Sequence, residues 1–234
     1  MPRCQRTLRY LHGTTAPGAG VGMWVCPHCA DNETYSTVRD PDLLVYVALA
    51  QSVTATDFGT ASDPKTPVLL LWGTRPECVY EPADRRYDIY LASVSDPWQA
   101  RLQIGHEIFH RTAGEGRVFH GAHEMLACLF SVRLLRRSGL SDYAERIVAA
   151  YRHEAALCAP ETLFAAAPWS DAAYPAGYYG RAYVTGVALE AAAGYPALCR
   201  LARTLTPAGV PDIAGWLDSL APETRHAVHG ILDT

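Results

Sequence analysis

The sequence has almost no lysine. Lys65 is the only lysine among 20 basic residues, so arginine supplies the other 19. Charged residues make up only 19% of the chain, and its formal net charge is −4. A protein that binds nucleic acid through phosphate contacts usually carries a net basic surface. The charge balance therefore does not indicate a nucleic-acid partner.

Long apolar runs are missing as well. The longest ones, 43–50 and 68–72, are far shorter than the roughly 20 residues that a membrane span needs. No apolar stretch follows the first five residues, so the start of the chain does not resemble a secretory signal. The seven cysteines are odd in number and form no evident disulfide framework. We therefore expect a cytoplasmic protein without a membrane association.

One short motif indicates a specific chemistry. Residues 106–110 read His-Glu-Ile-Phe-His, which is an H-E-x-x-H pattern. On a helix, positions four apart share one face, so His106 and His110 can occupy two corners of a zinc tetrahedron. Glu107 then stands beside the metal and can act as general base toward the water that attacks a carbonyl group. The motif therefore predicts a catalytic Zn²⁺ site.

The context of the motif supports a helical interpretation. Ser95 and Asp96 are capping residues and Pro97 suits a first turn, so the helix is expected to begin there and to end at Gly114. Just upstream, Tyr87–Ser93 alternates like an edge strand. An edge strand beside the metal helix could bind an extended peptide by strand addition.

A second helix, expected over about 120–137, contains a candidate third ligand, Glu124. The stretches Gln103–His110 and Glu124–Leu135 carry H-E-x-x-H and then E-x-x-A-x-x-F-S-x-x-L-L. This combination resembles the ImmA/IrrE-type zinc metallopeptidases, which belong to the gluzincin-like zincins. The likeness covers about 50 residues, from Ile89 to Leu135.

The resemblance implies a zincin-like α+β fold with a small sheet and a mostly helical C-terminal half. It also implies that His106 and His110 bind zinc, that Glu107 is the base and that Glu124 is the third ligand. The chain departs from the family pattern at Phe109, where glycine is common, and at Ser131, where alanine is common. The bulk of Phe109 is expected to alter packing near the metal helix.

Spacing alone leaves several roles open. His120 lies four residues before Glu124 and could replace it as ligand, hold it in place or stabilise an oxyanion. His123 is expected to be solvated or to cap the surface. Tyr179 and Tyr183 share a helix face, and either could donate to the oxyanion, although an aromatic packing stripe is the slightly favoured explanation. Cys128, which shares a face with Glu124, is interpreted as packing.

Residues 1–36 form a candidate zinc-ribbon-like appendage. Cys26-Pro27-His28-Cys29 is a C-P-x-C knuckle, and Cys4 lies upstream. Because a complete ribbon needs four ligands, His12 or His28 would have to complete a Cys3His site. The alternative is a pair of unliganded thiols in a flexible arm. A second, structural Zn²⁺ is the resulting prediction.

The rest of the chain, 37–234, is expected to form the zincin-like metallohydrolase domain. A helix from Asp40 to about Ser52, a polar loop over 54–66 and a buried strand over 68–72 precede the active-site helices at about 97–137. A helical subdomain over about 141–234 follows, interrupted by an irregular stretch over 159–175. Its later helices are expected at 177–193, 196–205, 211–220 and 222–232.

The favoured function is that of a zinc-dependent peptidase or amidase acting on a peptide or protein. A second hypothesis keeps the site but assigns it a small-molecule amide or ester. A third assigns the fold a binding or sensing role without catalysis. The sequence indicates neither the substrate nor the oligomeric state.

Overall fold

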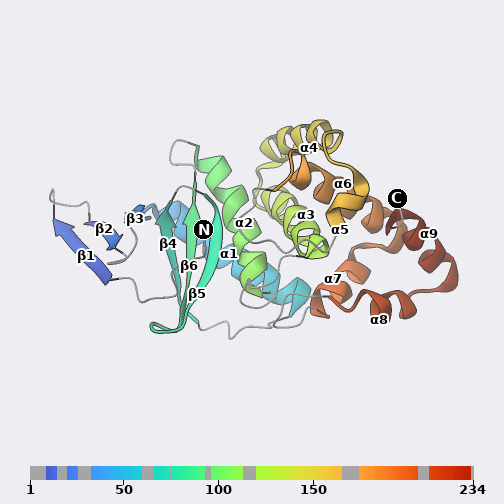
Figure 1. Ribbon diagram of the computed structural model, residues 1–234, viewed down its shortest axis with the longest axis horizontal. Helices are drawn as coiled ribbons and strands as arrows, with labels where there is room; N and C mark the ends of the chain where they lie inside the picture. Colours follow the sequence, from blue (N-terminus) through green and yellow to red (C-terminus); the bar gives the residue numbers. More distant parts are fainter. Residues whose placement is uncertain are drawn as a thin grey trace.

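The computed structural model describes residues 9–14, 20–25, 33–59, 66–73, 75–92, 96–112, 120–164, 174–204 and 211–232. Within these ranges the chain has an α+β fold in which helix predominates, as the sequence predicted. The strands lie at one end of the molecule and the last helices at the other (Figure 1). None of the helices in these ranges is both long enough and apolar enough to span a lipid bilayer.

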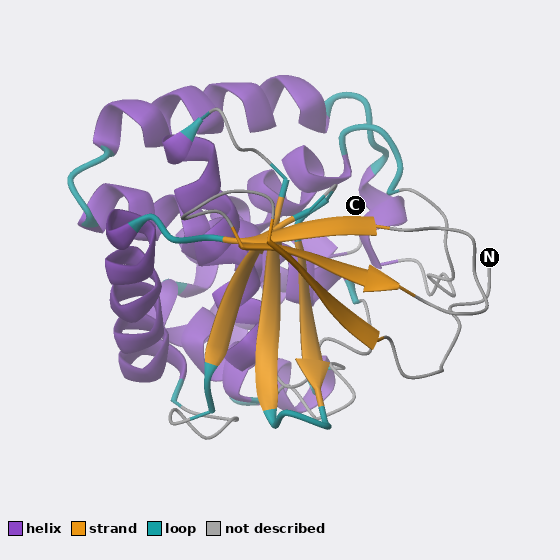
Figure 2. Ribbon diagram, turned by 90° about the vertical axis from the view of Figure 1, so that its left-hand side faces the viewer, coloured by secondary structure: helices purple, strands orange, loops and turns teal. Residues whose placement is uncertain are grey.

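The described strands form a mixed sheet in the order β1-β2-β3-β4-β6-β5. Their bounds are β1 Arg9–Thr14, β2 Gly20–Val25, β3 Glu33–Thr37, β4 Val68–Trp72, β5 Glu77–Glu81 and β6 Arg86–Leu91. Strands β4 and β6 are parallel, and the other neighbours are antiparallel. Figure 2 shows the strands fanning out in front of the helices. The predicted strand at 68–72 is therefore confirmed.

The prediction that Tyr87–Ser93 is an edge strand was wrong. This segment contains β6, which is paired on both sides, with β4 and with β5. The alternation in its sequence arises from Asp88, which is buried and accepts a hydrogen bond from Arg86 Nε at 2.7 Å. The edge strand next to β6 is β5, a short strand with a glutamate at each end that the sequence pattern did not indicate.

Helix α1 spans Pro41–Phe58 and begins as expected, with the Asp40 carboxylate accepting from the backbone N–H of Asp42 at 2.9 Å. Its predicted end at Ser52 was wrong, because the helix continues for six more residues. Thr54, which the sequence placed in a polar loop, is buried, and its hydroxyl donates a hydrogen bond to the Ala50 carbonyl oxygen. The helix ends at Phe58, a core residue, and Gly59 follows with φ 75°.

Helices α2, Pro97–Thr112, and α3, Gly121–Arg137, pack against each other and carry the candidate site. Asp96 begins α2 by accepting from the backbone N–H groups of Trp98 and Gln99 at 2.9 and 3.3 Å. The helix start was therefore predicted correctly. The helix end expected at Gly114 lies outside the described residues.

The position of α2 depends on its close approach to α3 and on an aromatic cluster that it shares with α1 and α3. A Cβ on Gly105 would lie 3.1 Å from Ser131 Cα, so glycine allows α2 to approach α3 closely. Phe109 is 1% exposed and packs edge-to-face on Phe58 at 5.2 Å between ring centroids. Phe130 completes this cluster at 6.2 Å from Phe109. The bulky Phe109 is thus accommodated in the core between α1 and α3.

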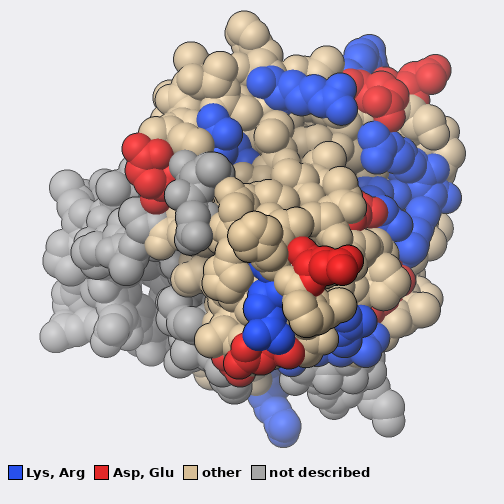
Figure 3. All heavy atoms as spheres, turned by 90° about the vertical axis from the view of Figure 1, so that its right-hand side faces the viewer, with Lys and Arg blue, Asp and Glu red and all other residues tan. Residues whose placement is uncertain are grey.

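The second half of the described chain is helical, as predicted. Its helices are α4 Ser141–Ala155, α5 Pro160–Phe164, α6 Tyr178–Ala193, α7 Tyr195–Arg203, α8 Ile213–Asp218 and α9 Pro222–Leu232. One cluster of buried apolar side chains extends from Val38 to Val228, and α3 lies within it. On the face drawn in Figure 3, basic and acidic side chains both lie at the surface. Helix α6 packs on both α3 and α4.

The crossing of α4 and α6 generates a first prediction. A Cβ on Gly180 would lie 2.4 Å from the carbonyl oxygen of Tyr151 and 2.7 Å from the backbone nitrogen of Ala155. Gly180→Ala should therefore lower the free energy of unfolding by about 1–3 kcal/mol through overpacking. Urea denaturation followed by circular dichroism measures this change.

Gly230→Ala is the matched control, because Gly230 lies in α9 with nothing within 4 Å of an added Cβ. It should be neutral or stabilise the protein by up to about 1 kcal/mol, since alanine favours helix. Equal effects of the two substitutions would contradict the close approach of α4 and α6.

Candidate metal centre

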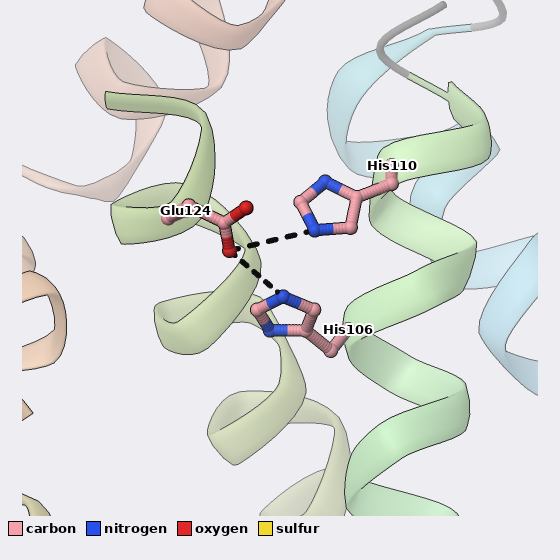
Figure 4. Close-up of side chains that lie close together, drawn as sticks. All are labelled: His106, His110 and Glu124. Carbon is pink, nitrogen blue, oxygen red and sulfur yellow. Dashed lines mark hydrogen bonds and ion pairs between the residues drawn. The ribbon is translucent and has the colours of Figure 1, made fainter. Parts of the chain in front are cut away.

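Two histidines of α2 and one glutamate of α3 converge on one point (Figure 4). Glu124 Oε2 lies 3.0 Å from His106 Nε2 and 3.5 Å from His110 Nε2. The possible ligand atoms of the three residues all lie within 4.8 Å of one another. The helical spacing of four aligns the two imidazoles, and the packing of α3 on α2 brings the carboxylate to them.

These separations suit a small tetrahedral metal ion. Ligand atoms about 2.0–2.1 Å from such an ion are about 3.3–3.4 Å from one another. The measured 3.0 and 3.5 Å between Glu124 Oε2 and the two Nε2 atoms lie close to that value. Two imidazoles and a carboxylate are common donors for several divalent metals. The geometry thus supports a metal site without identifying the ion.

Burial and the neighbouring charges shift the pKa values of Glu124 and His106 in opposite directions. Glu124 is 1% exposed. Burial opposes its ionisation, but the charge of His110 and hydrogen bonds from His106 and His110 bring its pKa well below the usual range. Burial likewise opposes the charge on His106, yet its contacts with Cys128 and Glu124 raise its pKa well above the usual value. A buried carboxylate is thus compensated by positive charge at the place where a cation would bind.

Tyr174 forms a hydrogen bond with the second oxygen of the Glu124 carboxylate. Its hydroxyl donates to Glu124 Oε1 at 2.8 Å, so Oε2 is the oxygen that faces the two histidines. Burial and the nearby charge of Glu124 raise the pKa of Tyr174, which keeps the hydroxyl protonated and able to donate. The sequence did not indicate this residue, because it ends a stretch without helical or strand periodicity.

Glu107 lies on α2 beside His106 and is 4% exposed. Burial raises its pKa, although the charges of His110 and His106 partly oppose that shift. A carboxylate with a raised pKa can accept and return a proton near neutral pH. Its environment therefore suits the role of general base that the motif predicted.

Only one of the two candidate tyrosines of α6 lies beside the site. The ring of Tyr179 is 5.7 Å from that of His106, edge-on, and the residue is 36% exposed. Tyr183 is buried, packs on Tyr151 at 5.3 Å and hydrogen-bonds to Arg136. These contacts fit the aromatic packing that the sequence slightly favoured for Tyr183. Its role as an oxyanion donor stays a prediction.

His120 lies outside the three-residue cluster. It precedes α3 as the N-cap residue, and its Nδ1 accepts from the backbone N–H of Ala122 at 3.2 Å. Burial lowers the pKa of His120, in keeping with a neutral acceptor. This capping role explains the residue without the ligand or oxyanion roles that the sequence left open.

The expectation that His123 is solvated was wrong. It is 1% exposed, and its ring packs at a tilt against that of His110, at 4.4 Å between centroids, and against that of Phe109, at 5.6 Å. Burial lowers the pKa of His123 well below its usual value, so the ring is neutral. The error arose because the first half of α3 is buried on every side, so its helical wheel has no solvated face.

The candidate zinc ribbon cannot be compared with the structure. Cys4, Cys26, His28 and Cys29 lie outside the described residues. His12 belongs to β1, whose backbone alone is described. The structural Zn²⁺ thus stays a prediction of the sequence.

Comparison of the chain with models of known protein families, with curated proteins and with solved structures yields no match. The chemistry of the site is therefore inferred from its own side chains.

Replacing Glu124 should abolish tight metal binding. Glu124→Gln removes the charge that balances two imidazoles and an ion, and should weaken Zn²⁺ or Co²⁺ affinity by at least about 100-fold. Chelator-competition titration of the purified protein measures the affinity. Glu190→Gln is the matched control, because Glu190 accepts from Arg133 Nη1 at 2.6 Å away from the cluster. Unchanged affinity in Glu124→Gln would exclude this carboxylate as a ligand.

Tyr174→Phe should weaken metal affinity by roughly tenfold, since hydrogen bonds that orient metal ligands contribute about 10- to 100-fold. Tyr195→Phe removes an equivalent 2.8 Å bond, to Asp57 Oδ2, away from the site and should leave affinity unchanged. The same titration applies to both variants. Equal metal affinities of Tyr174→Phe and Tyr195→Phe would show that the Tyr174 hydroxyl does not position Glu124.

Proposed function

We propose that the protein is a zinc-dependent hydrolase that cleaves amide bonds, with peptides as its substrate class. The observation that carries this proposal is the cluster of His106, His110 and Glu124 with Glu107 on the same helix. A ligand set of two histidines and one glutamate is typical of catalytic zinc sites, which keep the fourth position for water or substrate. The resemblance of Ile89–Leu135 to the ImmA/IrrE-type peptidases supports the same chemistry.

In this proposal His106, His110 and Glu124 would hold the ion. When bound, zinc would supply Lewis-acid polarisation of the carbonyl and would lower the pKa of water toward about 7. Glu107 takes the proton from the water as the water attacks the carbonyl carbon. It then returns this proton to the leaving nitrogen, so that the carboxylate is regenerated.

Tyr179 is the proposed donor to the oxyanion. Its ring lies against that of His106, and its partial exposure leaves it accessible to a substrate. Burial and the charge of Glu124 raise the pKa of Tyr179, so its hydroxyl stays protonated. A donor aimed at developing negative charge contributes about 3–4 kcal/mol to lowering the barrier.

The position of an edge strand supports a peptide substrate. Strand β5 is one edge of the sheet, it is partly exposed and packs next to α2, and the charge of Glu77 contributes to the raised pKa of Glu107. An extended peptide could add to β5 through main-chain hydrogen bonds and so reach the catalytic base. The binding of a peptide by strand addition, first expected at Tyr87–Ser93, is thus proposed for Glu77–Glu81.

A small-molecule amide is the second candidate substrate. Tyr174, Tyr178 and Tyr179 form a group of rings with centroids 4.9 to 6.0 Å apart, and Tyr179 contacts His106. Such rings could bind a flat or apolar ligand. Parallel screens with a fluorogenic peptide library and with aryl amides distinguish the two substrate classes. A binding or sensing role without catalysis predicts no turnover in either screen.

Glu107→Gln tests the mechanism. It should lower kcat by about 1,000-fold or more, because the amide cannot accept the proton from water, while metal content stays at the wild-type level. Turnover of the best substrate from the screen and elemental analysis of the same preparation measure both quantities. Glu154→Gln, at an exposed position of α4, is the control. Full activity in Glu107→Gln would overturn the proposed mechanism.

A further inference from the structure

The two histidines of the cluster differ in what contacts their second ring nitrogen. His106 Nε2 faces Glu124, and its Nδ1 lies 4.0 Å from the Cys128 sulfur. In the described part of the chain, His110 Nδ1 is buried without a hydrogen-bond partner. The His110 ring instead packs edge-on against that of His106, at 4.5 Å between centroids, and at a tilt of 30° against that of His123, at 4.4 Å. Both Nε2 atoms therefore face Glu124, but only His106 has a polar contact at its second ring nitrogen, Nδ1.

Cys128 is placed for this contact by the geometry of α3. It follows Glu124 by four residues, so the two side chains lie on one face of the helix, one turn apart. Its side chain is completely buried. Helix α3 thus supplies both the carboxylate that faces Nε2 and the sulfur that faces Nδ1 of the same histidine.

A second contact connects the thiol to α4. The Tyr151 side chain hydrogen-bonds to Cys128, and the Tyr151 ring packs on Tyr183 of α6. Burial and the neighbouring thiol raise the pKa of Tyr151 well above its usual value, so its hydroxyl is a donor. A chain of side chains therefore leads from α4 through Cys128 to His106 and Glu124.

A histidine that binds a metal through Nε2 carries its proton on Nδ1 and usually donates it to a carboxylate, a carbonyl or water. That second contact sets the ring orientation and the basicity of the ligand nitrogen. We propose that the Cys128 sulfur is the acceptor that positions His106 for metal binding, and that Tyr151 holds the sulfur in place. This inference rests on the proposed metal site and adds two positioning residues to it.

The proposed role of Cys128 differs from that of a cysteine that only packs in the core. Cys158 is also buried, but its Sγ contacts the backbone carbonyl oxygen of Ala159 at 3.6 Å, and it lies outside the cluster. Loss of either thiol should disturb core packing to a similar degree. Only loss of Cys128 should change the metal site.

The test compares Zn²⁺ affinity among purified variants by chelator competition, with thermal unfolding recorded for each. Cys128→Ala should weaken the affinity by roughly tenfold, Cys128→Ser should restore most of it because the hydroxyl can still accept, and Cys158→Ala should leave it unchanged. Tyr151→Phe should weaken affinity less than Cys128→Ala does. The double variant should be no weaker than Cys128→Ala, since Tyr151 acts through the thiol.

Co²⁺ loading gives a readout that core packing alone would not alter. The ligand-field spectrum should change in Cys128→Ala and Tyr151→Phe but not in Cys158→Ala. Tyr151→Phe retains the thiol, so it keeps the test informative if Cys128→Ala fails to fold.

Three outcomes would overturn the inference. Wild-type affinity in both Cys128→Ala and Tyr151→Phe would overturn it while leaving the proposed hydrolase intact. A sulfur-to-cobalt charge-transfer band in the wild type that disappears in Cys128→Ala would show the sulfur to be a ligand instead. Absence of metal binding by the wild type would overturn both this inference and the proposed function.

Discussion

The carboxylate of Glu124 is buried almost completely within a helical core, and a charge there is tolerated only when donors and cations surround it. Its two oxygens satisfy this condition differently. Oε1 accepts from Tyr174, while Oε2 faces the imidazoles of His106 and His110. Glu124 belongs to α3, and its partners belong to α2 and to the segment before α6. The need to compensate one buried charge therefore fixes how these three segments pack together.

The packing of α2 makes this meeting possible. Gly105 lets the helix approach Ser131 of α3, and Phe109 packs against both Phe58 and Phe130, which also contact each other. The glycine and the aromatic ring act on one rigid helix, so together they limit both its distance and its rotation. The imidazoles of His106 and His110 are thereby directed toward α3. The bulky side chain of Phe109 is accommodated because α1 extends far enough to bring Phe58 to it.

The same packing arranges the surroundings of the site. Tyr179, at the start of α6, lies against His106, while the next tyrosine on that face, Tyr183, is already in the core. On the other side, β5 is the last strand in the order of the described sheet and packs beside α2. The proposed oxyanion donor and the proposed peptide-binding edge therefore lie on elements that contact the ligand-bearing helices. A hydrolase needs such an arrangement, because base, donor and substrate must meet at one carbonyl group.

Local patterns predicted the local features well. The spacing of His106 and His110, the cap at Asp96, the strand at 68–72 and the helical second half all follow from interactions between residues close in the sequence. Predictions failed where burial came from distant segments. The polar Thr54 did not end α1, because Phe58 beyond it packs on α2 and α3. His123 is buried because α3 has neighbours on all sides.

By itself the sequence determined the α+β class and the H-E-x-x-H helix, and it left Glu124 and His120 as alternative third ligands. Only the tertiary structure decided that Glu124 converges with the two histidines, that β5 and not β6 lies at an edge of the sheet, that Tyr174 contacts Glu124 and that Cys128 contacts His106. The reason is physical. Helical periodicity and capping act over a few residues and can be recognised in a sequence. Strand order and contacts such as Tyr174 with Glu124 join segments far apart in the chain, and they depend on how the whole core packs.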